Sequence, residues 1–184
     1  MSKKPILKIL LFAIPVILMI FLLLVALRPP EFRVARSITI NAPPEAIFPH
    51  VNELKLWEAW NPWGKLDPNM KLTYAGPPAG VGASYAWAGN NDVGEGRAAI
   101  TESRTNELVQ FKMEWLKPMS GVSTVEFTFK PQGNQTEVTW SMTGKNNFIA
   151  RAFCMFMNMD KMIGGQFEKG LADMKTIAET PAKP

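Results

Sequence analysis

The feature that most constrains this chain is an uncharged apolar run of 19 residues at positions 9–27. As an α-helix the run is about 28 Å long, close to the ~30 Å hydrocarbon core of a bilayer. We therefore expect residues 1–30 to form an uncleaved, single-pass membrane anchor that spans about 9–27. A cleaved signal peptide is the alternative. It needs a shorter apolar core and a small residue three positions before the cut, and Leu24 stands there for a cut after Ala26.

The orientation of this anchor is not decided by its flanking charges. Three basic residues stand on each side of the run: Lys3, Lys4 and Lys8 before it, and Arg28, Arg33 and Arg36 after it. The positive-inside rule gives no answer for such a tie. We expect the N-terminus to lie inside and the following domain to be exported, periplasmic or extracellular, with a cytoplasmic domain as the alternative.

Charge and composition exclude several classes of protein. The formal net charge is +4, but all of the surplus lies in residues 1–30, and residues 31–184 carry equal numbers of basic and acidic side chains. A body without basic excess is not expected to bind nucleic acid. One cysteine and one histidine exclude an internal disulfide and metal sites rich in Cys or His, so we expect no metal and no cofactor.

Residues 31–180 are expected to form one α+β domain, followed by a short tail at 181–184. Alternating apolar and polar residues predict seven strands, which make an antiparallel sheet with one wet face. The expected strands are 32–41, 70–74, 83–88, 94–103, 108–116, 122–130 and 136–143. Two short helical pieces are expected at 44–51 and 53–57, directly after the first strand.

The C-terminal third is expected to be helical. A stripe of apolar residues at intervals of three or four, from Ile163 to Ile177, predicts an amphipathic helix. Gly164 and Gly165 interrupt it, so a break is expected between positions 158 and 165. The preceding segment, 148–159, is apolar almost all round, which predicts a buried helix; a flap dipping into the bilayer is the alternative.

Several motifs resemble those of a known family. ITINAPPEAIF at 38–48, followed by WEAWNPW at 57–63, is similar to the opening of the polyketide cyclase/dehydrase-like branch of the START-related SRPBCC superfamily. GEGR at 94–97, and MNMDKM at 157–162 followed by FEKGL at 167–171, resemble membrane-anchored bacterial members.

This resemblance implies a helix-grip fold. In that fold a curved antiparallel sheet of about seven strands surrounds a long C-terminal helix, two short helices follow the first strand, and a cavity lies between sheet and helix. Members bind lipids, sterols or polyketides; some are cyclases or aromatases, and others are binding or co-chaperone modules. Because no catalytic motif is common to all of them, the resemblance supplies no catalytic residue.

Aromatic and methionine side chains are the candidates to line such a cavity, since flexible thioethers and aromatic rings suit varied apolar ligands. The predicted lining residues are Trp60, Trp63, Tyr74, Tyr85, Trp87, Phe111, Met113, Trp115, Phe127, Phe129, Trp140, Met142, Phe153 and Met157. The competing interpretation is an ordinary packed core. Trp57 is expected to hold the short helices against the sheet, and Trp60 and Trp63 to form the rim or gate.

Polar candidates are few. Glu95 and Arg97 lie two apart on one expected strand, which favours a cross-strand surface ion pair over an anchor for a ligand head group. His50 is expected to be structural rather than a general base, and Cys154 to be an inert buried thiol.

Two classes of function follow. We predict a membrane-tethered, non-catalytic module that binds a hydrophobic small molecule or lipid. The alternative is a cyclase- or dehydratase-type enzyme acting on a polyketide-like substrate, and a protein-interaction domain is a third reading. The absence of a recognisable acid–base pair in the sequence favours binding. Nothing in the sequence indicates a protein partner.

Overall fold

The computed structural model describes the backbone of residues 4–180 and the side chains of residues 12–180. The helical elements are α1 (Lys4–Leu27), α2 (Pro44–Asn52), α3 (Phe148–Phe153), α4 (Met159–Glu179) and two 3₁₀ helices, η1 (Leu54–Ala59) and η2 (Pro62–Lys65). The strands are β1 (Glu31–Ile40), β2 (Lys71–Ala75), β3 (Ser84–Ala88), β4 (Glu95–Arg104), β5 (Leu108–Lys117), β6 (Gly121–Gln132) and β7 (Gln135–Lys145). The expected tail at 181–184 lies outside the described residues.

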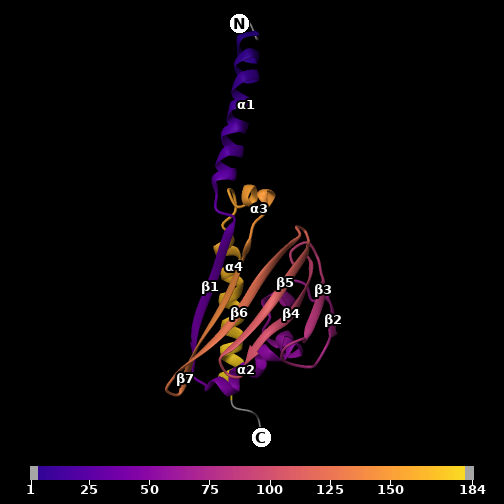
Figure 1. Ribbon diagram of the computed structural model, residues 1–184, viewed down its shortest axis with the longest axis vertical. Coiled ribbons are helices and arrows are strands. Elements are labelled where there is room, and N and C mark those ends of the chain that lie inside the picture. Colours follow the sequence, from indigo (N-terminus) through magenta and orange to yellow (C-terminus); the bar gives the residue numbers. More distant parts are fainter. Residues whose placement is uncertain (1–3, 181–184) are drawn as a thin grey trace.

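The seven strands form one antiparallel sheet in the order β1-β7-β6-β5-β4-β3-β2. Buried and exposed positions alternate along β6 and β7, which places one face of the sheet against the core and the other toward solvent. Register shifts between β4 and β5, at Glu95/Gly96 and Ile100/Glu102, are the kind of irregularity that bends a sheet. The sheet curves around α4 (Figure 1), so the expected sheet and C-terminal helix are confirmed.

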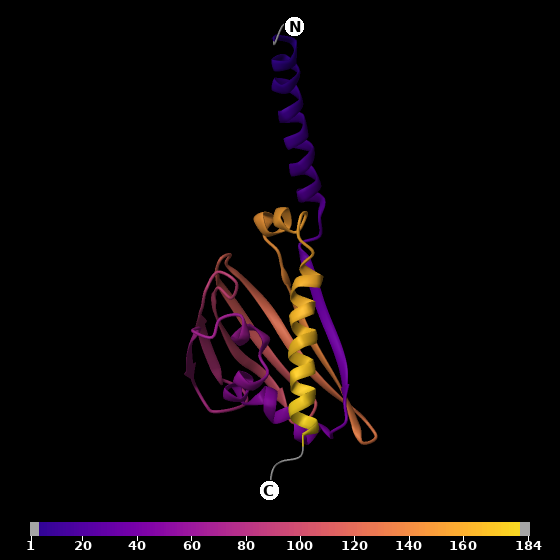
Figure 2. The same ribbon diagram turned by 180° about the vertical axis from the view of Figure 1, so that it is seen from behind.

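Helix α4 lies along the concave side of the sheet and runs beside β1 (Figure 2). The side chain of Asn158 caps its first turn by accepting from the backbone N–H of Lys161 at 2.9 Å. Arg36 on β1 hydrogen-bonds Asp160 and Glu168 across Gly164. These contacts attach the start of the helix to the edge of the sheet.

The expected break in this helix lies elsewhere. Residues 164 and 165 sit inside α4, which continues without interruption from Met159 to Glu179. The chain leaves helical geometry earlier, between α3 and the Asn158 cap. The low helix propensity of glycine is outweighed because Gly164 makes room for the Arg36 guanidinium on the helix surface.

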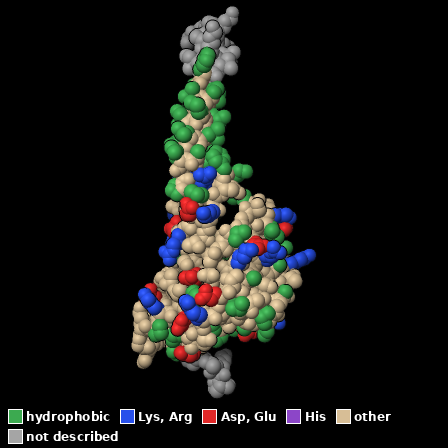
Figure 3. All heavy atoms as spheres, viewed as in Figure 1, with side chains coloured by type: hydrophobic (Ala, Val, Ile, Leu, Met, Phe, Trp, Pro, Cys, Tyr) green, Lys and Arg blue, Asp and Glu red, His purple; other side chains and the backbone are tan. Residues whose placement is uncertain are grey.

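Helix α3 is not the buried helix that its apolar sequence predicts. None of its residues is buried, and Ile149 and Phe153 are exposed. Figure 3 shows apolar side chains along α1 and beside its base, where Figure 1 places α3. The physical reason is that α3 and the turn after it pack against the end of α1 instead of the sheet. Arg151 on α3 donates to the carbonyl of Ala26 at 3.2 Å, and the ring of Phe156, just after α3, stacks on that of Phe21 at 5.9 Å.

The prediction of a transmembrane helix is also contradicted. Within the part of the chain that the structure describes, no helix combines the length and the apolarity needed to cross a membrane. The prediction of a single-pass membrane anchor is therefore wrong, and the predicted export of the domain loses its basis.

Candidate functional site

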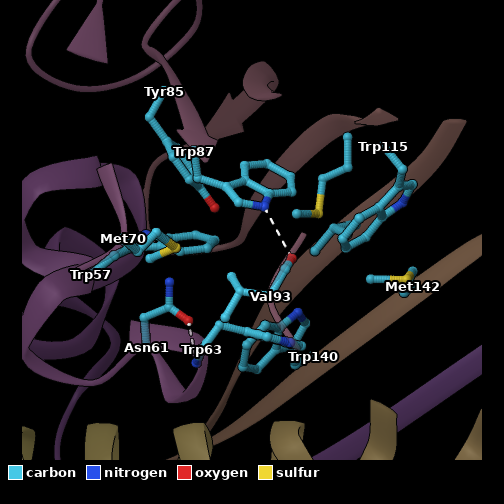
Figure 4. Close-up of a pocket in the computed structure, with 12 residues that line it drawn as sticks. Trp57, Asn61, Trp63, Met70, Tyr85, Trp87, Val93, Trp115, Trp140 and Met142 are labelled. Carbon is cyan, nitrogen blue, oxygen red and sulfur yellow. Dashed lines mark hydrogen bonds between the residues drawn. The ribbon is translucent and has the colours of Figure 1, made fainter. Parts of the chain in front are cut away.

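A small apolar pocket lies on the concave side of the sheet, and we call it the inner pocket. Six aromatic side chains surround it: Trp57, Trp63, Tyr85, Trp87, Trp115 and Trp140. The other lining residues are Asn61, Met70, Val93, Met113, Val125 and Met142. Strands β3, β5, β6 and β7 provide one wall and the segment from η1 to Met70 provides the other (Figure 4).

The inner pocket is not beneath the C-terminal helix, where the cavity was expected. No residue of α4 lines it. The space under α4 is filled because Trp140 stacks on Phe167 with ring centroids 4.1 Å apart, and because Gly170 brings the helix backbone against the Trp140 ring. The pocket therefore lies to one side of the helix, between the sheet and the two 3₁₀ helices.

The volume of the inner pocket is about 30 Å³. This is enough for one or two water molecules and far below the ~300–1,000 Å³ of typical small-molecule sites. A ligand can enter only if side chains move. Met70, Met113 and Met142 are the candidates to do so, because the unbranched thioether side chain changes shape at little cost.

A second, larger hollow adjoins the inner pocket, and we call it the outer cleft. Its volume is about 410 Å³. Trp57, Asn61, Met70 and Tyr85 line both spaces and so form the partition between them. The outer cleft also contains charged side chains, among them Glu58, whereas the inner pocket has none.

Hydrogen bonds fix much of the partition and the pocket wall. The indole N–H of Trp57 donates to the carbonyl of Val51 at 2.9 Å, and that of Trp115 donates to Ser123 Oγ at 3.2 Å. The amide oxygen of Asn61 accepts from the backbone N–H of Trp63 at 3.1 Å. The aromatic frame is therefore held in place, and Met70 is the flexible member of the partition.

Two tyrosines stand near the partition, and both remain protonated at neutral pH. Complete burial raises the pKa of Tyr85 well above its usual value. Burial, and then the hydrogen bond that Tyr74 Oη donates to Glu58 Oε1 at 2.8 Å, raises the pKa of Tyr74. Neither hydroxyl is tuned to exchange a proton near pH 7.

The structure brings together half of the residues that the sequence nominated as cavity lining. Those at the inner pocket are Trp63, Tyr85, Trp87, Met113, Trp115, Trp140 and Met142. Phe111, Phe127, Phe129 and Trp60 belong to the packed core, and Trp60, expected at the rim, is fully buried. Tyr74 lines the outer cleft, Met157 lines a separate hollow at the base of α1, and Phe153 is exposed on α3.

Sequence reasoning missed five lining residues. Trp57 was expected to hold the short helices against the sheet, and Asn61, Met70, Val93 and Val125 were not among the predicted lining residues. Met70 and Val93 stand in connections just outside strands, where alternation carries no information. Asn61 within the WEAWNPW motif had a signal, since it is an uncharged polar residue between two tryptophans.

The polar candidates lie outside the inner pocket, in surface ion pairs or in hydrogen bonds that support the fold. Glu95 pairs with Lys117 at 2.7 Å, and Arg97 pairs with Glu114 on the neighbouring strand, so both point away from the pocket. The carbonyl of His50 accepts from the Trp60 indole at 3.0 Å, and burial lowers the pKa of its imidazole. Cys154 is a free, half-buried thiol. Among the described side chains, no group of three or more His, Cys, Asp or Glu is placed to hold a metal ion.

In this structure a curved antiparallel sheet holds one long C-terminal helix. Two short helical segments follow β1 and α2, and an apolar pocket lies on the concave face. These features define a helix-grip domain. The family model described as "Polyketide cyclase / dehydrase and lipid transport" matches residues 31–179, so the chain belongs to this family. The resemblance to the superfamily is thereby confirmed, whereas the likeness to its membrane-anchored members finds no support. No curated protein matches the sequence.

Solved structures share the fold at low sequence identity. A protein from Chromobacterium violaceum is 12% identical with a TM-score of 0.59, and the match covers 84% of this chain and 100% of that one. A protein from Mesorhizobium loti is 15% identical with a TM-score of 0.59, covering 83% and 100%. The Aha1 dimer from Colwellia psychrerythraea is 17% identical with a TM-score of 0.58, covering 80% and 96%. At such identities these matches describe the fold alone.

Proposed function

We propose that the protein binds a hydrophobic small molecule, or the apolar chain of a lipid, across the inner pocket and the outer cleft. The observation that carries this proposal is that an aromatic pocket of about 30 Å³ without charged lining residues is separated from a cleft of about 410 Å³ by a partition that contains Met70. When Met70 moves aside, the two spaces join and reach the size of an ordinary small-molecule site. Family membership supports the same conclusion.

The contrast between the two spaces suggests how such a ligand is oriented. The apolar part enters the inner pocket, which has no charged lining residue. A polar part remains in the outer cleft, near Glu58, Lys65 and Asp67. Burying each part in matching surroundings avoids leaving a polar group without partners.

Binding is favoured over a cyclase or dehydratase reaction by the state of the titratable groups at the site. Catalysis by proton transfer needs an acid or base whose pKa lies near the working pH. Tyr85 is the titratable side chain of the inner pocket, and burial moves its pKa away from neutrality. Glu58 and Tyr74, in the outer cleft, are hydrogen-bonded to each other.

The proposal is tested with the full chain and the uncharged fluorescent probe N-phenyl-1-naphthylamine. Because five of the six tryptophans line the inner pocket, a probe bound there should quench tryptophan emission strongly by energy transfer. We expect Met142→Phe, which fills the pocket with a bulkier and stiffer side chain, to weaken probe binding by about tenfold or more.

The matched control is Met119→Phe, the same exchange at an exposed position outside the pocket. It should leave both the affinity and the quenching unchanged, while thermal melting confirms that both variants fold. If the two variants bind the probe as the parent does, the probe sits on exposed apolar surface, and the inner pocket is not the binding site.

A further inference from the structure

The indole N–H of Trp140 is a buried hydrogen-bond donor without an acceptor. The side chain of Trp140 is 2% exposed, and its Nε1 has no hydrogen-bond partner among the described residues. Buried tryptophan N–H groups usually have a partner, because an unpaired polar group costs free energy in an apolar interior. The unpaired N–H of Trp140 therefore requires a structural or functional explanation.

The rest of the fold satisfies its buried indoles. The N–H groups of Trp57, Trp60 and Trp87 donate to backbone carbonyls at 2.9, 3.0 and 3.4 Å. Trp115 donates to Ser123 Oγ at 3.2 Å. Trp140 lies in the same aromatic cluster as these residues, and its donor is the one among them that has no acceptor in the described part of the chain.

The contact of the Trp140 ring with α4 shows which end of the indole carries the unpaired donor. A Cβ placed on Gly170 would lie 2.9 Å from Cζ3 of Trp140, so the Cζ3 corner faces the helix. In an indole, Nε1 is at the opposite end of the ring system from Cζ3. Nε1 is thus the end of the ring farther from Gly170, and Trp140 lines the inner pocket, between Trp63 and Met142 in the view of Figure 4.

The surroundings of this donor define the kind of group that would complete it. The inner pocket has no charged lining residue, and the Asn61 amide oxygen accepts from the backbone N–H of Trp63. An ionised ligand would be left without a counter-charge there, whereas a neutral oxygen needs only a single donor.

We propose that the inner pocket selects an uncharged apolar molecule bearing a ketone or aldehyde carbonyl, and that Trp140 Nε1 donates to the carbonyl oxygen. This inference rests on the proposed binding function and adds the ligand class and the residue that recognises it. An apolar molecule of the same shape but without an acceptor would leave the Trp140 donor buried and unpaired.

The test compares two probes of nearly equal shape on the full chain: 2-acetylnaphthalene, which has the carbonyl oxygen, and 2-isopropenylnaphthalene, which has a methylene group in its place. Their dissociation constants are measured by tryptophan quenching with the parent protein, with Trp140→Phe, and with Trp115→Phe. The preference for the ketone is the dissociation constant of the alkene divided by that of the ketone. We expect this preference to be about fivefold higher in the parent protein than in Trp140→Phe, because about fivefold is the contribution of one hydrogen bond.

Trp115→Phe is the matched control. It removes an indole from the same pocket, but one whose N–H already has a protein acceptor, so the preference for the ketone should be unchanged. A second readout does not depend on any variant folding. In the parent protein the Nε1–H proton resonance of Trp140, assigned through bonds, should move downfield with the ketone and stay in place with the alkene.

The outcomes separate this inference from the binding function. If both probes bind but the ratio is the same in all three proteins, or the Trp140 resonance does not distinguish ketone from alkene, the inference is overturned while binding stands. A Trp140 resonance already shifted downfield in the free protein and unmoved by either probe would assign the donor to a bound water, which also overturns it. If neither probe binds, the proposed function itself fails.

Discussion

At the scale of single residues, the pocket depends on the absence of a side chain at Gly96. A Cβ at this position on β4 would overlap the six-membered ring of Trp87 and lie 2.7 Å from the carbonyl oxygen of Glu114. The close approach lets the Trp87 ring pack against the backbone of β4, and the same ring meets Trp115 at a centroid distance of 5.5 Å. A glycine within a strand usually weakens it, and here it allows a pocket wall to form.

We therefore expect Gly96→Ala to lower the free energy of unfolding by roughly 1–3 kcal/mol and to displace Trp87, because backbone atoms cannot move aside easily. Gly121→Ala is the matched control: it lies at the start of β6, and its nearest neighbour would be Trp115 Cδ1 at 4.0 Å. That variant should be neutral or slightly stabilised. Urea denaturation followed by tryptophan fluorescence measures both, and equal losses in the two variants would contradict the role of Gly96.

At the scale of elements, Arg36 on β1 attaches the start of α4 to the sheet. Arg36 donates from Nε to Glu168 at 2.6 Å and from Nη2 to Asp160 at 2.9 Å. The hydrogen bonding between Arg36 and Asp160 lowers the pKa of Asp160. The carboxylates are well exposed, so each ion pair contributes little by itself. The geometry requires Gly164, because a Cβ there would occupy the space of the guanidinium group.

Neighbouring glycines in α4 offer a direct test of this attachment. Gly165→Ala meets no atom within 4 Å, and it should raise the free energy of unfolding by up to about 1 kcal/mol through helix propensity alone. Gly164→Ala gains the same propensity but displaces Arg36, so we expect no net gain or a loss. The difference between the two, measured by urea denaturation, should shrink at 1 M salt as the ion pairs are screened. Equal stabilisation by both substitutions would show that the Arg36 contacts contribute nothing.

At the scale of the whole molecule, the dependence of stability on pH between 5 and 7 should come from one group. His50, the single histidine, is half-buried at the end of α2, and burial lowers its pKa below the usual 6.5. The unfolded chain then binds a proton more readily than the folded one. Stability is fully present above pH 6.5 and is lost as the pH falls below it.

We expect the free energy of unfolding to decrease from pH 7 to pH 5, and His50→Gln to remove most of that slope. Asp160→Asn is the control, since the hydrogen bond from Arg36 lowers the pKa of Asp160 and that contribution is lost only below about pH 4. Denaturation at each pH measures both variants. A slope in this range that persists in His50→Gln would assign it to other groups.

Much of the fold was predictable because strand alternation is a local signal. Each of the seven strands lies within two residues of its expected bounds, and the helical pieces after β1 were expected as well. The C-terminal helix was expected, but its course through Gly164 and Gly165 was not, because only the position of Arg36 on a strand far away in sequence explains why glycine is suitable there. The apolar runs at the start of the chain and at 148–159 were misread for the same reason, since apolarity alone does not say what an element packs against.

The sequence by itself determined the number and order of strands, the superfamily, and a supply of aromatic and methionine side chains on the inner face of the sheet. Only the tertiary structure decided which of those side chains fill the core and which enclose a pocket. Trp60, Trp63 and Trp140 look alike in the sequence, yet the first is sealed in the core, the second borders the pocket, and the third stacks under α4 with its N–H unpaired. The physical reason is that periodicity specifies the face on which a residue lies, whereas an empty space or an unsatisfied donor depends on how several distant segments meet.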